Sequence, residues 1–123
     1  MSRILYVHTG GLNAPERSAT PIYLATTAAA MDIDVGIYFT VNGPQLLRKG
    51  AAEALIVPKY DGTGAPLKRF IDQALDLGVK FYVCQPSLDL HGLTREDLID
   101  GVEMIGGAAF NDMALESDQV ICF

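Results

Sequence analysis

The sequence lacks the patterns that mark most metal and nucleotide sites. It contains only two cysteines and two histidines, with no CxxC pair, no HExxH motif and no other zinc-type spacing. It also lacks GxGxxG and GxxxxGK(S/T), so the glycines at positions 10, 11, 62 and 64 are typical of turns rather than of phosphate-binding loops. We therefore expect no metal site and no organic cofactor.

Positive charge and long apolar runs are also scarce. Fifteen acidic side chains outnumber nine basic ones, and the resulting net charge of −6 argues against nucleic acid or an acidic membrane surface as the main partner. No run approaches the roughly 18–20 apolar residues of a membrane span, and no apolar secretory segment follows Met1. We expect a cytoplasmic protein with no membrane span, in which the two cysteines are free rather than joined in a structural disulfide.

Apolar segments of strand and helix type alternate along the 123 residues, which we interpret as one domain, 1–123. The alternation predicts an α/β three-layer sandwich with a mainly parallel five-stranded sheet flanked by helices. Turn residues separate these segments, including a glycine-rich loop at 58–65, an irregular stretch at 85–93 and a capping box at 94–97. The expected strands are 3–8, 35–40, 53–57, 79–84 and 119–123, and the expected helices are 16–31, 44–49, 66–77 and 108–116.

Cys84 is the first candidate for chemistry because it ends the apolar strand 79–84. Pro86 ends any regular strand pairing there, and ligands in open α/β sheets collect at the carboxyl ends of strands. A helix beginning at this point would lower the thiol pKa from its ordinary value of about 8.5 and favour the nucleophilic thiolate. The alternative is an inert buried cysteine, a common core residue, and position alone leaves both interpretations open.

Four further residues are possible supporting groups. Ser87 is a potential hydrogen-bond donor or cap in the segment after Cys84. His8 ends the first strand and His91 follows Cys84 by seven residues, so either could pair with the thiol, or both could be ordinary hydrogen-bonded loop histidines. Cys122 ends the last strand and would lie near Cys84 only if their two strands adjoin; otherwise it is a core residue.

Six segments distributed along nearly the whole chain form a pattern in their order and spacing: Ala14–Arg17, Phe39–Thr40, Lys49–Glu53, Val83–Leu93, Glu96–Glu103 and Gly107–Ala109. Together they resemble the DsrE/DsrF-like family of small sulfur-relay proteins. The resemblance implies a compact α/β sandwich that assembles as a homotrimer or homohexamer. It also implies that Cys84 carries sulfane sulfur as a persulfide and passes it to a TusA-like carrier or a rhodanese-like partner.

Two other functions remain open at this stage, and both make the protein a non-catalytic module of the same fold. One is a small-molecule or nucleotide site at the sheet edge formed by His8, Thr40 and Cys84. The other is an oligomerising scaffold in which Cys84 is only a core residue. Whether the chain is a sulfurtransferase is therefore a hypothesis that depends on the accessibility and ionisation of one thiol.

Overall fold

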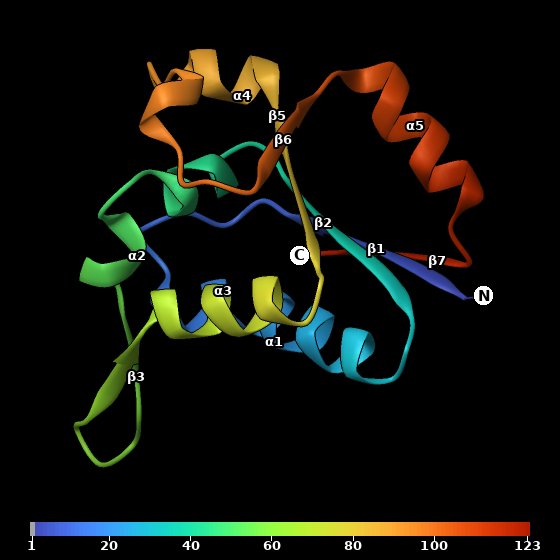
Figure 1. The fold of residues 1–123 in the computed structure, drawn as a ribbon. Helices are drawn as coiled ribbons and strands as arrows, with labels where there is room; N and C mark the ends of the chain where they lie inside the picture. The colour runs from blue at the N-terminus through green and yellow to red at the C-terminus, as the bar shows by residue number, and fades with distance from the viewer. Residues whose placement is uncertain (1) are drawn as a thin grey trace.

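The computed structural model describes residues 2–123 and contains a five-stranded parallel sheet (Figure 1). The strand order is β6-β5-β2-β1-β7, and every neighbouring pair is parallel. Parallel neighbours need long crossover connections, which the helices supply. The strands are β1 (Arg3–His8), β2 (Asp34–Phe39), β5 (Lys80–Cys84), β6 (Val102–Ile105) and β7 (Gln119–Cys122).

Helices cover both faces of the sheet, so the predicted three-layer α/β sandwich is confirmed. Helices α1 (Pro15–Ala30) and α3 (Leu67–Asp76) lie side by side on one face, and α5 (Gly107–Glu116) lies on the other (Figure 1). Pro15 stands in the first turn of α1, where its missing amide costs nothing, while Pro21 lies within the helix. Helix α1 thus starts one residue before the expected helix 16–31.

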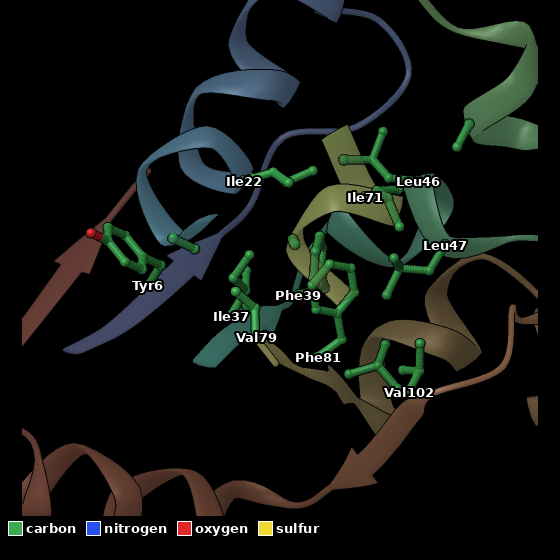
Figure 2. Close-up of a cluster of buried hydrophobic side chains, with 14 of the residues drawn as sticks. Tyr6, Ile22, Ile37, Phe39, Leu46, Leu47, Ile71, Val79, Phe81 and Val102 are labelled. Atoms are coloured by element: carbon green, nitrogen blue, oxygen red, sulfur yellow. The ribbon is translucent and has the colours of Figure 1, made fainter. Parts of the chain in front are cut away.

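The larger core lies between the sheet and the α1/α3 layer (Figure 2). Phe39 of β2 and Phe81 of β5 are fully buried there, and their ring centroids are 5.2 Å apart. Ala25 and Ala28 let α1 approach the sheet closely. Burying each large apolar side chain contributes about 1.5–3 kcal/mol, so this core fixes the relative positions of β2 and β5.

One predicted strand of the sheet is wrong, and another was missed. Residues 53–57 do not join the main sheet: α2 (Ala51–Ala54) precedes β3 (Ile56–Pro58), which pairs only with β4 (Gly64–Pro66) in an exposed antiparallel hairpin. The fifth strand is β6, which pairs with β5 at the sheet edge. In β6 the charged Glu103 interrupts a four-residue apolar run between glycines, and such a short edge strand leaves little signal in the sequence.

The remaining elements are short. The expected short helix near Pro44 is η1 (Gly43–Leu47), and the capping box forms η2 (Arg95–Asp97). The stretch 85–93, expected to be irregular, begins with a helix, α4 (Gln85–Leu90). No helix among residues 2–123 combines the length and apolarity needed to cross a bilayer.

Candidate functional site

Cys84 is both the last residue of β5 and the residue that caps the start of α4. Its backbone is extended, and the helix begins at Gln85 with no loop between. Pro86 occupies the first turn of α4, where a backbone N–H would have no partner within the helix, so the missing N–H of proline breaks no hydrogen bond. Pro86 therefore marks both the end of β5 and the start of α4, next to the Cys84 thiol.

The Cys84 thiol lies on the sheet face covered by α5 and is partly exposed. A small apolar cluster surrounds it, in which the ring of Tyr38 packs against Phe110 of α5 with a centroid distance of 4.5 Å. The neighbouring strand β6 places Ile105 opposite Cys84. The thiol is thus bordered by apolar groups without being sealed in by them, so the interpretation of Cys84 as an inert core residue fits poorly.

Neutral hydrogen-bond donors set the ionisation of this thiol. Partial burial acts to raise the pKa of Cys84, but the hydroxyl groups of Ser87, Tyr38 and Thr40 and the backbone amide of Ser87 outweigh it, so that the pKa is lowered. Hydrogen bonds to the charged form favour that form. The site therefore stabilises a thiolate with three hydroxyl groups and one amide.

Tyr38 remains a donor in this arrangement. Burial raises the pKa of the Tyr38 hydroxyl, and its hydrogen bond with Cys84 raises it further. The phenol therefore keeps its proton at neutral pH and donates to the sulfur, while the thiol is the group that ionises.

Ser87 and His91 both hold the segment that follows β2. The Val41 N–H donates to Ser87 Oγ at 2.9 Å, and His91 Nε2 donates to the Val41 carbonyl oxygen at 2.8 Å. Val41 has a φ of +58°, which is unusual for a β-branched residue, and these two bonds maintain it. Because the amide occupies the Ser87 oxygen, the Ser87 hydrogen is available to Cys84 or to Thr40 Oγ1, 3.3 Å away.

His8 lies elsewhere, so a pairing of His8 with the thiol does not fit this geometry. Its side chain is fully buried on the α1 side of the sheet, stacked on Phe39 with centroids 5.3 Å apart, and its Nε2 lies 2.9 Å from the Ser18 carbonyl oxygen. Burial lowers the pKa of His8 despite the opposing effect of the bond to Ser18. Side chains alternate between faces along a strand, which explains why His8 and Cys84 end on opposite sides.

Cys122 also lies apart from Cys84. It is exposed on β7, whereas Cys84 is on β5, and the strands β2 and β1 lie between them. Three strand spacings of about 4.8 Å put roughly 14 Å between the two strands. The condition for two cooperating thiols, adjoining strands, is therefore not met.

Sequence reasoning missed the part that Tyr38 plays and the strained turn at Val41. Both lie on or just after β2, and only the adjacency of β2 and β5 brings them to the thiol. The alternation along β2, which places Tyr38 and Thr40 on one face, is the signal that could have identified the hydroxyls. Among residues 2–123, no three side chains of the His, Cys, Asp and Glu types gather as they would around a metal ion.

Comparisons with known proteins agree with the fold and with the predicted family. The chain is 31% identical to an uncharacterized protein of Methanocaldococcus jannaschii, over 88% of each protein. It is 29% identical to the sulfur carrier protein DsrE2 of Allochromatium vinosum, over 80% of this chain and 84% of that protein. The crystal structure of the ychN protein from E. coli superposes with a TM-score of 0.81 at 20% identity, covering all of both chains.

The family itself is recognised along the whole described chain rather than in one motif. The pattern of the DsrE/DsrF-like family matches residues 2–123, which include β1, the thiol site and β7. With this match, the chain belongs to the DsrE/DsrF-like family.

Proposed function

We propose that the protein is a sulfur carrier that holds sulfane sulfur as a persulfide on Cys84. The observation that carries the proposal is the partly exposed thiol at the β5–α4 junction, where hydroxyl and amide donors lower its pKa. The family match and the similarity to a protein named sulfur carrier protein DsrE2 support it. A thiolate is the form that attacks sulfur, so this environment suits the proposed activity.

The proposed reaction is two displacements at one sulfur atom. In the first, the Cys84 thiolate attacks the outer sulfur of a donor persulfide R–S–SH, forms Cys84–S–SH and releases R–S⁻. In the second, an acceptor thiolate attacks the outer sulfur of Cys84–S–SH and releases the Cys84 thiolate. One S–S bond forms and one breaks in each step, so no external oxidant or reductant is needed.

The site residues assist both displacements in the same way. The hydroxyls of Ser87, Tyr38 and Thr40 stabilise negative charge on the Cys84 sulfur, which is the nucleophile in the first step and the leaving group in the second. His91 acts indirectly in this scheme, because its bond to Val41 holds the turn from which Thr40 reaches the site. His8 and Cys122 have no part in it.

We further propose a protein partner and an oligomer in the cytoplasm. The acceptor would be a TusA-like or rhodanese-like carrier, and the chain would assemble as a homotrimer or homohexamer. The face that carries Cys84 supports these contacts, because α5 has no buried residue and leaves Leu115 86% exposed. Sedimentation at high protein concentration tests the assembly, and a monomer would contradict it.

Sulfur loading tests the central proposal. We expect that incubation with polysulfide or thiosulfate, followed by intact-mass measurement, adds the mass of one sulfur atom to the wild type. The adduct should disappear in Cys84→Ser and persist in the matched control Cys122→Ser, because only Cys84 lies among the activating donors. An adduct on Cys122 alone, or no adduct from either donor, would contradict the proposal.

A further inference from the structure

A second candidate site lies at the carboxyl ends of β1 and β7, on the side of the sheet where His8 is buried. The strand order runs from β1 outward to β6 and then returns through α5 to β7 on the other side of β1. The carboxyl ends at such a reversal are where open α/β sheets bind ligands. A cavity of about 340 Å³ occupies this place, and residues from the β1–α1 loop, the start of α1 and Phe123 line it.

His8 contributes an unpaired polar atom to the wall of this cavity. Its Nε2 faces the Ser18 carbonyl oxygen at 2.9 Å and must carry the hydrogen of that bond, so Nδ1 of the neutral ring is an acceptor. No described residue within 2–123 partners Nδ1, although the side chain is completely buried. Buried polar atoms nearly always have a hydrogen-bond partner, so we expect a hydrogen-bond donor from outside the chain to bind Nδ1.

Gly10, which also lines the cavity, lies beside the edge of the His8 ring that carries Nδ1. A Cβ built on Gly10 would lie 3.8 Å from Nδ1 and 3.5 Å from Cε1 of His8, with no other atom beyond its chain neighbours within 4 Å. An alanine at position 10 would therefore place its methyl group in van der Waals contact with this edge of the ring. The missing side chain of Gly10 therefore leaves room beside the unpaired acceptor.

The other end of the cavity favours an acidic group. Helix α1 is 16 residues long and its first turn, with Arg17, lines the cavity, while its capping residue Ala14 offers no side-chain hydrogen bond. The positive end of a helix and a guanidinium both attract an anion. Glu16 also lines the cavity, so one cation and one anion balance, which favours a monoacid or a zwitterion over a polyphosphate.

We propose that this cavity binds a small organic acid that also carries an N–H or O–H donor. The Arg17 guanidinium and the Glu16 amide, at the start of α1, bind the acid group, and His8 Nδ1 accepts the hydrogen bond from the donor. Amino acids and hydroxy acids share this chemistry, and the volume lies at the lower end of the range for small-molecule sites. The site is separate from Cys84, which lies on the other face of the sheet.

The test follows the two histidines by NMR after labelling with ¹⁵N-histidine, since His91 serves as an internal control. The probes are glycine and L-serine in one arm, glycolate and L-lactate in a second, and inorganic phosphate and ATP in a third. We expect a probe from the first or second arm to shift Nδ1 of His8 and to leave His91 unchanged. Binding of glycine identifies the donor as an ammonium group, and binding of glycolate or L-lactate identifies it as a hydroxyl group.

Matched variants then separate binding from general structural effects. Gly10→Ala fills the room beside Nδ1 and Arg17→Gln removes the cation, so each should weaken binding about tenfold or more. The matched controls are Gly107→Ala, at a glycine with open space around it, and Arg69→Gln, at an exposed position of α3, and neither should weaken binding. Cys84→Ser should bind normally, because the proposal does not depend on the sulfur carrier activity. The proposal is overturned if neither acid arm moves the His8 signal, if phosphate or ATP alone binds, or if Gly10→Ala and Arg17→Gln bind as the wild type does.

Discussion

The two faces of the sheet differ in how thoroughly they are covered. On one face α1 and α3 close over a core that contains the fully buried Phe39 and Phe81. On the other face α5 alone packs over a smaller cluster around Tyr38, and Cys84 lies there, partly exposed. The densely packed face therefore fixes the strands, while the thinly covered face leaves Cys84, at the end of β5, partly exposed.

Removing one aromatic ring from each face tests this difference and should give the largest change in the free energy of unfolding. Phe39→Ala should lower the free energy of unfolding by about 3–5 kcal/mol, because it leaves a cavity in a core that cannot collapse around it. Phe110→Ala removes a half-buried ring that α5 packs on the thinly covered face, and it should cost roughly 1–2 kcal/mol. Urea denaturation measures both, and equal losses would remove the proposed distinction between the faces.

The buried histidine of the densely packed face should make stability depend on pH. Burial lowers the pKa of folded His8, so the unfolded chain binds more protons below the ordinary histidine pKa of about 6.5, and stability is lost as pH falls below that value. The slope contributed by His8 is at most about 1.4 kcal/mol per pH unit. Urea denaturation at several pH values measures it.

Two substitutions assign this pH dependence. His8→Gln removes the titrating group and retains a donor that can face the Ser18 carbonyl oxygen, so it should flatten the profile below pH 6.5. His91→Gln, on the exposed side of the molecule, is the control and should leave the slope in place. A slope that survives His8→Gln would assign the pH dependence to other groups.

On the thinly covered face, the rate at which Cys84 is alkylated should depend on the hydroxyl groups around its thiol. Ser87→Ala removes the first of the donors that lower the pKa of Cys84, so the midpoint of its alkylation profile should move to higher pH. Since one pKa unit corresponds to a tenfold change in thiolate, we expect alkylation by iodoacetamide near pH 6 to slow by up to about tenfold. The measurement uses a Cys122→Ser background so that only Cys84 reacts.

Another serine supplies the control for this experiment. Ser117 bonds the Met113 carbonyl oxygen at the end of α5 and does not contact the thiol, so Ser117→Ala should leave the profile unchanged. Tyr38→Phe should shift the profile in the same direction as Ser87→Ala. If neither Ser87→Ala nor Tyr38→Phe moves the midpoint, the hydroxyl groups do not activate Cys84.

The sequence predicts the parts of the molecule that carry strong local signals. The strand that ends at Cys84 and the first strand, which ends at His8, are predicted correctly because both are rich in β-branched and aromatic residues. The family resemblance emerges as well, because its segments extend along the whole chain. The edge strand β6 does not, because four residues with a charge among them give no clear periodicity.

The environment of the thiol depends on strand adjacency, which no local pattern records. The sequence predicts that Cys84 lies at the carboxyl end of its strand but does not show that β2 lies beside β5, so the donors Tyr38 and Thr40 are found only in the structure. The same adjacency separates Cys122 from Cys84 and turns His8 to the opposite face. The order of the strands in the sheet thus decides which of the candidate residues lie close enough to act together.

The smallest change in stability is expected for a substitution at Val41, in the turn that follows β2. Its amide and carbonyl are held by Ser87 and His91 beside the thiol, while the next amide, of Asn42, donates to the Thr9 carbonyl oxygen near the second cavity. At a φ of +58°, a valine is strained by about 1–2 kcal/mol, and glycine is not. Glycine loses about 0.5–1 kcal/mol through its greater freedom when unfolded. Val41→Gly should therefore raise the free energy of unfolding by at most about 1.5 kcal/mol, whereas Val41→Ala, which keeps the strain, should not raise it. Urea denaturation measures both, and a loss of stability in Val41→Gly would show that the exposed valine side chain, rather than its two backbone bonds, holds the turn.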